Sequence, residues 1–281
     1  MAKVLVTGAK GQLGQDVVRL FTEAGHEVIG LGREDLDITN SNDVWRCLEA
    51  LRPEVVIHSA AYTAVDQAES DVEGAFLVNA YGTRNMAAAS EAVEAKLVYM
   101  STDYVFNGES DQPYNEFEAT SPLGVYGKSK HAGEQFVREL HSRFFIARTS
   151  WVFGAHGGNF VKTMLRLAET QPQLKVVHDQ RGCPTYTVDL ANCLLKMIET
   201  SQFGTYHVSN SGVCTWYEFA KTIFEKKGIS IDVVPVTTEE FPRPARRPKN
   251  SAFDHMALRL NGFEELPDWQ NALDRFLDEV K

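Results

Sequence analysis

The first half of the chain alternates short apolar segments with longer amphipathic ones. Short, almost continuously apolar runs predict strands over residues 4–7, 27–31, 55–59, 97–101 and 144–147. Between them, apolar positions three and four apart predict helices over residues 11–23, 41–51 and about 71–93, and over a segment containing Tyr126 and Lys130. We expect Ser41 to cap the helix over 41–51, which stops before Pro53. Strands this apolar are typical of a parallel sheet buried on both faces.

The alternation becomes less regular after residue 150. Helices are predicted over 160–169, 188–200, 216–227 and 269–280, and strands over 174–177, 206–208 and 231–236. A proline-rich stretch covers 241–248, and no Gly/Ser-rich linker marks a boundary. The sequence therefore predicts an α/β protein with a Rossmann-type doubly wound parallel sheet in residues 1–150. Residues 151–281 are predicted to form mainly a smaller, interleaved substrate-binding domain, with some segments returning to the sheet.

Composition and charge exclude several classes of function. A net charge of −10 over 281 residues argues against general nucleic-acid binding. No stretch approaches the ~20 apolar residues of a membrane span, and the N-terminus enters the first strand rather than a secretion signal. The four cysteines are isolated, and the eight histidines contain no His-x-x-x-His pair, so we expect reduced thiols and no catalytic metal. These features predict a cytoplasmic protein.

A glycine pattern follows the first strand. Gly8, Gly11 and Gly14 stand between that strand and an amphipathic helix. Gly8 permits a tight turn, Gly11 lets the backbone approach a pyrophosphate, and Gly14 lets helix and sheet pack closely. Free N–H groups at the start of the helix can then bind phosphates. The alternative is a plain strand–helix turn, and the context on both sides favours a dinucleotide site.

The end of the second strand bears on the choice of coenzyme. A carboxylate there suits the free ribose of NAD, whereas an arginine suits the 2′-phosphate of NADP. Arg33 follows the strand and Lys10 lies in the glycine loop, but Glu34 and Asp35 come next. We therefore expect a preference for NADP(H), with NAD(H) as the other possible coenzyme. The alternative for Arg33 is a solvated loop position without a role in coenzyme binding.

Tyr126 and Lys130 lie one helical turn apart, some 110 residues after the glycines. Residues four apart share a helix face, so the phenol and the ammonium can act at one point. A nearby cation stabilises phenolate, which would lower the pKa of the tyrosine toward neutrality. A proton donor beside a hydride-carrying dinucleotide predicts an oxidoreductase.

Longer runs are more particular than these two signals. They read VTGAKGQLG (6–14), AAYTAVDQAE (60–69), STDYVF (101–106), SPLGVYGK (121–128), RTSWVF (148–153), GCPT (182–185) and RPKNS (247–251). With them the chain resembles the extended short-chain dehydrogenase/reductases and, within these, the dTDP-4-dehydrorhamnose reductases, over nearly its whole length. The resemblance implies NADPH-dependent reduction of the C4 keto group of dTDP-4-dehydro-β-L-rhamnose to dTDP-L-rhamnose, a donor for polysaccharide biosynthesis. Two alternatives stay open: a reductase of another nucleotide-linked 4-keto sugar, and a non-catalytic, cofactor-binding regulatory subunit.

The resemblance also implies roles for single residues. Tyr126 would protonate the carbonyl oxygen, Lys130 would lower the Tyr126 pKa and hold the nicotinamide ribose, and Thr102 would hydrogen-bond to the reacting oxygen. Besides Lys10, Arg33, Tyr126 and Lys130, the expected cofactor contacts are Gly8, Gly11, Gln12, Leu13, Gly14, Asp37, Ile38, Ala60, Ala61 and Tyr62. The expected substrate contacts are Val65, Thr102, Asp103, Trp151, Asn159, Phe160 and Arg247.

Four of these assignments have structural alternatives. Thr102 could instead be only an N-cap or a strand-end hydroxyl. Asp37 could instead cap the helix after Thr39. The Trp151 indole face suits the apolar side of a deoxysugar, but the residue could simply be buried. Arg247 lies in a basic segment that suits a diphosphate, and a solvated loop is its alternative.

Some relatives of the resembled family form dimers around a divalent cation held by carboxylates. Asp16, Asp189 and Glu279 fall at comparable positions, with Asp in place of the longer Glu at two of them. A homodimer and a Mg²⁺ ion are therefore open questions. We assign no metal ligand and expect these three side chains to be exposed helix-surface charges.

Overall fold

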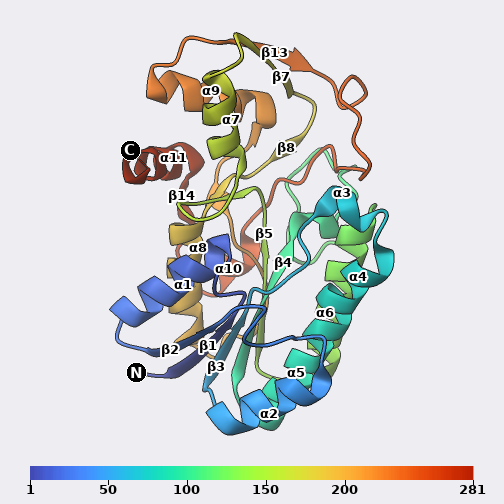
Figure 1. The fold of residues 1–281 in the computed structure, drawn as a ribbon, viewed down its shortest axis with the longest axis vertical. Helices are drawn as coiled ribbons and strands as arrows, with labels where there is room; N and C mark the ends of the chain where they lie inside the picture. Colours follow the sequence, from blue (N-terminus) through green and yellow to red (C-terminus); the bar gives the residue numbers. More distant parts are fainter. Residues whose placement is uncertain (281) are drawn as a thin grey trace.

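The computed structural model describes residues 1–280, and a six-stranded parallel sheet forms its centre (Figure 1). The strand order is β10-β5-β4-β3-β1-β2, and each strand runs parallel to its neighbours. These strands are β1 (Lys3–Thr7), β2 (Glu27–Leu31), β3 (Val55–His58), β4 (Lys96–Thr102), β5 (Phe144–Thr149) and β10 (Gly204–His207). The order reverses at β1, between β2 and β3, which is where open α/β sheets bind ligands beyond the carboxyl ends of their strands.

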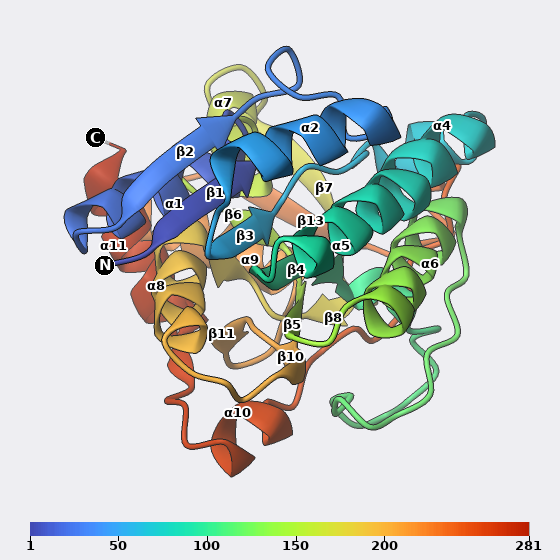
Figure 2. The same ribbon diagram turned by 90° about the horizontal axis from the view of Figure 1, so that it is seen from below.

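Helices cover both faces of the sheet, which confirms the doubly wound prediction (Figure 2). Val4 and Val6 point to one face, where they join a buried core with α1 and α8, while Leu5 points to the other. This alternation follows from the two-residue repeat of a strand. The helices on the first face are α1 (Gln12–Glu23) and α8 (Thr187–Ile198), and those on the second are α2 (Ser41–Leu51), α5 (Thr83–Ala92) and α6 (Val125–Leu140).

A smaller lobe lies above the carboxyl ends of the strands in Figure 1. Its own core is rich in aromatic side chains, including the fully buried Phe153, Phe219 and Phe276. The elements around it are β6 (Val152–Phe153), α7 (Phe160–Ala168), β7 (Gln173–Val177), β8 (Arg181–Gly182), β9 (Thr185–Tyr186), β12 (Cys214–Thr215), α9 (Trp216–Lys227), β13 (Asp232–Val236) and α11 (Trp269–Glu279). The rest of the second half consists of β10, α8, β11 (Asn210–Ser211), α10 (Met256–Leu260) and β14 (Leu266–Asp268). Because β10 pairs with β5, residues from the second half complete the sheet.

Some local predictions are wrong in detail. The helix expected over 71–93 is preceded by α3 (Val65–Ala68) and divided into α4 (Val72–Phe76), a π-helical stretch η1 (Leu77–Gly82) and α5. Asn40, not Ser41, caps α2, since its side-chain oxygen accepts from the backbone of Asn42. Within residues 1–280, no helix has both the length and the apolar character needed to span a membrane.

Candidate active site

A cleft of about 1370 Å³ opens over the carboxyl ends of the central strands, between the sheet and the smaller lobe. Loops that follow β1, β2, β3 and β4 form one side, and residues from the smaller lobe form the other. The wall includes most of the residues expected to bind cofactor: Gly8, Lys10, Gly11, Gln12, Leu13, Gly14, Arg33, Asp37, Ile38, Ala60, Ala61 and Tyr62.

The glycine loop fits a diphosphate. Gly8 has φ +67°, and a Cβ there would lie 2.7 Å from the backbone nitrogen of Ala60. A Cβ on Gly14 would overlap the Gly8 carbonyl, so both positions require glycine. Gly11 precedes the first turn of α1 and provides no side-chain cap, so the N–H groups of that turn face the cleft without a side-chain partner. Such N–H groups, together with the helix dipole, favour an anion.

Acidic and basic side chains from the glycine loop and from the loop after β2 line part of the cleft. Lys10 forms ion pairs with Glu34 and, at 4.0 Å, with Asp35. Hydrogen bonds from Thr39 lower the pKa of Asp37, and the charge of the exposed Arg33 lowers it further. The alternative cap role of Asp37 does not hold, because Asn40 caps α2. Lys10 and Arg33 therefore both line the cleft, but Lys10 is already paired with an acid, Glu34.

Thr102 and Tyr126 meet at the centre of the cleft. Thr102 ends β4, and Tyr126 lies in the first turn of α6, which begins beside the end of that strand. The Thr102 hydroxyl lies near enough to Tyr126 to counter part of the rise that burial causes in the pKa of its phenol, and it donates to Oδ1 of Asp103 at 3.0 Å. The ring of Tyr104 packs edge-on against Tyr126, with 5.4 Å between centroids. A hydroxyl pair at the carboxyl edge of the sheet can hydrogen-bond to a single carbonyl oxygen.

The expected lowering of the Tyr126 pKa is wrong for this structure. Burial raises the pKa of Tyr126 to about 12, the Thr102 hydroxyl opposes this increase, and the charge of Asp103 adds to it. Lys130 does not reverse the effect, because burial also lowers its own pKa, to about 7, while Glu134 acts in the opposite direction. The Lys130 Nζ lies 4.2 Å from the centre of the Tyr99 ring, beneath the cleft rather than in its wall. Desolvation thus outweighs the cation, and the phenol stays protonated at neutral pH.

A buried ion pair supports the helix that carries these residues. Glu134, one turn after Lys130, accepts from Arg148 Nε and Nη2, both at 2.8 Å, and from the Ser101 hydroxyl at 2.6 Å. Arg138 adds a second cation at 2.9 Å. These contacts hold the Glu134 pKa at about 2 despite its complete burial. They connect α6 to β4 and β5 directly below Thr102.

Three residues in the wall of the cleft carry a polar atom without a partner. Within residues 1–280, Oδ2 of Asp103, Oγ1 of Thr149 and the Tyr62 hydroxyl are buried without a hydrogen bond, and all three residues line the cleft. Burial also raises the pKa of Asp103 to about 6. Unpaired buried polar atoms cost free energy, so their presence here favours a polar ligand.

The expected substrate residues fall into two groups. Val65, Thr102, Asp103, Trp151 and Phe160 line the cleft. Asn159 and Arg247 do not. The Asn159 amide donates to Gln12 and caps α7, whereas Arg247 forms a bidentate pair with Asp66 at 3.0 and 3.1 Å. The side chains of Asn159 and Arg247 are therefore already paired within the protein. The alternative for Arg247, a solvated loop position, does not hold either.

Sequence reasoning missed several residues that shape the site. Asn79, in the π-helical stretch, accepts from the Tyr62 backbone N–H and donates to the Ser129 hydroxyl, so it joins the loop after β3 to α6. Trp216 lines the cleft and stacks on Trp151. A single sequence offers no periodic signal for such residues, because their partners are distant along the chain.

We expected Asp16, Asp189 and Glu279 to be exposed charges on helix surfaces, and this expectation is wrong for Asp16 and Asp189. Asp16 is fully buried, where it accepts from the Thr187 hydroxyl and from Arg19. Asp189 is buried and pairs with Arg275 at 2.6 and 2.7 Å. Glu279 is exposed and accepts from the Tyr186 hydroxyl. Among residues 1–280, no group of three or more His, Cys, Asp or Glu side chains is placed to hold a metal ion.

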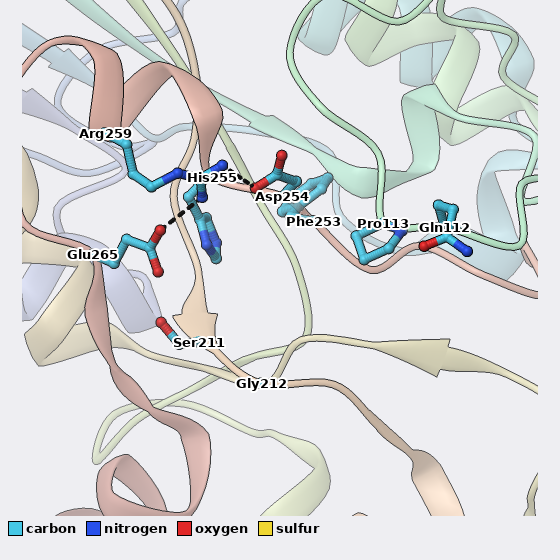
Figure 3. Close-up of a pocket in the computed structure, with 9 residues that line it drawn as sticks. All are labelled: Gln112, Pro113, Ser211, Gly212, Phe253, Asp254, His255, Arg259 and Glu265. Carbon is cyan, nitrogen blue, oxygen red and sulfur yellow. Dashed lines mark hydrogen bonds and ion pairs between the residues drawn. The ribbon is translucent and has the colours of Figure 1, made fainter.

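A second hollow of about 410 Å³ lies away from the cleft (Figure 3). Arg259 crosses it and forms ion pairs with Asp254 and Glu265, both at 2.7 Å. His255 is turned to the Ser209 hydroxyl at 2.8 Å. Its charged groups are therefore paired with one another, and we assign it no ligand.

Comparisons with known proteins agree with this geometry. The family model described as RmlD substrate binding domain matches residues 2–281. The spore coat polysaccharide biosynthesis protein SpsK of Bacillus subtilis (strain 168) is 45% identical over 99% of this chain and 98% of its own length. A dTDP-4-dehydrorhamnose reductase of Escherichia coli (strain K12) is 39% identical over 99% and 97%. A crystal structure of dTDP-4-dehydrorhamnose reductase from Bacillus anthracis in complex with NADP superposes with a TM-score of 0.97, at 50% identity and 99% coverage of both chains. With a family match over almost every residue, and relatives similar over their whole length, the chain belongs to the family defined by the RmlD substrate binding domain.

Proposed function

We propose that the protein reduces the C4 keto group of dTDP-4-dehydro-β-L-rhamnose with NADPH to give dTDP-L-rhamnose. The observation that carries the proposal is the Thr102–Tyr126 hydroxyl pair in a cleft that also holds the glycine loop. The E. coli relative is named for the corresponding reductase, and the B. anthracis structure contains NADP.

The cofactor would lie across the carboxyl ends of β1 and β3, where NADPH would supply the hydride when bound. The N–H groups at the start of α1 would hold its diphosphate, and Ala60, Ala61 and Tyr62 would border its nicotinamide half. Lys10 and Arg33 would hold the 2′-phosphate. Lys10 would give up its ion pair with Glu34 and bind the phosphate instead. Lys130, which lies below the wall, would reach the ribose by leaving the Tyr99 ring.

Tyr126 would deliver the proton. Its raised pKa keeps the phenol protonated near pH 7, so the acid is loaded before the substrate binds. As hydride adds to C4, the carbonyl oxygen becomes an alkoxide, which is far more basic than phenolate, so a proton moves from Tyr126 to that oxygen. Thr102 would hydrogen-bond to the same oxygen, and the phenolate would regain a proton from solvent.

The smaller lobe would hold the sugar nucleotide. Asp103 has a free buried oxygen that suits a sugar hydroxyl, and Val65, Trp151 and Phe160 supply apolar surface beside it. Asn159 would shape the site indirectly, through its hydrogen bond to Gln12 and its capping of α7. Arg247 would reach the diphosphate after exchanging Asp66 for it.

The direct test follows NADPH oxidation by absorbance with a panel of nucleotide-linked 4-keto sugars. We expect dTDP-4-dehydro-β-L-rhamnose to give the highest kcat/KM and dTDP-L-rhamnose as product. A higher kcat/KM with another keto sugar would reassign the substrate. Cofactor binding without oxidation on any keto sugar would instead favour the regulatory-subunit alternative.

Coenzyme choice provides a separate prediction. Neutralising both bases (Lys10→Met with Arg33→Met) should weaken NADPH binding and spare NADH, because only NADPH carries the 2′-phosphate. Charge-assisted hydrogen bonds contribute about 1.5–3 kcal/mol each, so the preference for NADPH in Kd should fall at least about tenfold. Arg46→Met is a matched control, since Arg46 is likewise exposed and paired with an acid, Asp43, but lies outside the cleft. Equal losses for both coenzymes would place the 2′-phosphate elsewhere.

A further inference from the structure

Trp151 has a strained backbone in the wall of the cleft. Its φ is +47°, in the left-handed region that bulky residues rarely adopt. Arg52 and Glu94 are the other non-glycine residues with positive φ among residues 1–280, and each lies in the turn just after a helix, where this conformation is common. Trp151 instead stands between β5 and β6 and lines the cleft. Such a conformation persists only where surrounding contacts impose it.

Three contacts impose it. The Trp216 indole stacks on the Trp151 indole with 3.5 Å between centroids and 8° between planes. Gly182 also packs against the Trp151 ring, since a Cβ there would lie 2.5–2.7 Å from three ring atoms. The Trp151 carbonyl accepts from the Thr185 backbone N–H at 3.2 Å.

The topology of the smaller lobe brings these contacts together. Gly182 in β8 pairs with Cys214 in β12, and Trp216 follows β12 as the first residue of α9. Thr185 begins β9, which pairs with β6 directly after Trp151. The run Gly182–Thr185 and Trp216 thus form one seat for the indole, which we call the Trp151 seat.

We propose that Trp216 is a positioning residue for the reduction, which fixes the Trp151 indole so that the sugar is held in register with Thr102 and Tyr126. Trp216 also contacts Phe160, with ring centroids 4.6 Å apart, but its stacked contact with Trp151 is the one that we assign to positioning the sugar. The inference rests on the proposed function. Because stacking by Trp216 covers one face of the Trp151 indole, the sugar can use only the remaining surface of that ring.

The geometry can be tested without turnover. With 5-fluorotryptophan incorporated, the chain has four ¹⁹F resonances, from Trp45, Trp151, Trp216 and Trp269. Trp216→Leu and Trp216→Phe should each shift the Trp151 resonance, because both remove the stacked indole, and Gly182→Ala should shift it with Trp216 still present. The Trp45 resonance should stay in place, since Trp45 lies on α2. An unmoved Trp151 resonance in the folded Trp216 variants would overturn the proposal.

A double-mutant cycle tests the role in catalysis. We expect Trp216→Leu to lower kcat for the keto sugar at least about tenfold, because small misplacement of a substrate is costly, and to leave the Kd of NADPH within threefold. In a Trp151→Leu background the same change should have less than a threefold further effect, since Trp216 acts through Trp151. Multiplicative losses would mean that Trp216 acts independently and would overturn the positioning role. Wild-type protein inactive on every keto sugar would refute the proposed function, whereas the ¹⁹F shifts would still test the seat.

Discussion

Tyr126→Phe is expected to lower kcat by about 10²–10⁴-fold, the usual contribution of a general acid. The change removes one hydroxyl, so hydride addition would generate an alkoxide with no adjacent proton donor. The ring itself is retained, including its edge contact with Tyr104. We therefore expect the melting temperature to change by a few degrees at most, and NADPH binding to stay within a few-fold. Stopped-flow or steady-state NADPH oxidation, together with titration of the coenzyme, measures both quantities.

A matched control is Tyr81→Phe, which removes the same group from a tyrosine that is 52% exposed and outside the cleft. Its kcat should equal that of the wild type. If Tyr126→Phe kept a kcat within a few-fold of wild type, the proton would have to come from another group. Asp103 would then be the first candidate, because burial raises its pKa to about 6 and its carboxyl group hydrogen-bonds to Thr102.

Glu134→Gln is expected to destabilise the fold by about 3–5 kcal/mol. The wild-type carboxylate is fully buried and neutralises Arg148, whose side chain is only 3% exposed. A neutral amide would leave that guanidinium charge buried without an anion. The nearby His207 cannot supply one, because burial and Arg148 hold its pKa well below the usual value and the imidazole is neutral. Urea titration at pH 7 measures the loss of unfolding free energy.

The same ion pair predicts a pH dependence. The folded pKa of Glu134 is about 2, below its ordinary 4.5, so the carboxylate stabilises the fold above pH 4.5 and loses this effect as the pH falls toward 2. The unfolding free energies of wild type and Glu134→Gln should therefore converge by about 3 kcal/mol across this window. Glu139→Gln, an exposed change on the same helix, should stay within about 0.5 kcal/mol of wild type throughout. A constant gap between wild type and Glu134→Gln would mean that the carboxylate's charge is not what stabilises the fold.

The sequence by itself determined the central sheet, its helices and the location of the site. The apolar runs of β1, β3 and β4 could be recognised because a strand buried on both faces has almost no polar positions. The glycine spacing was informative because Gly8 and Gly14 meet backbone that excludes any side chain. Local signals of this kind depend on residues close together in the chain, so a single sequence contains them.

Only the tertiary structure decided how the side chains are paired and buried. The Tyr126 pKa depends on desolvation by several elements, which reverses the direction expected from Lys130 alone. Arg247 meets Asp66 across 181 residues, and Asp16 is buried against Thr187 across 171. Neither residue is a solvated charge, and the sequence alone could not show this because the partners are so distant. Trp151 and Trp216 stack only because β8 and β12 pair. Sequence patterns report the environment of a residue along its own element, whereas charge states and contacts in the site depend on which elements the fold packs together.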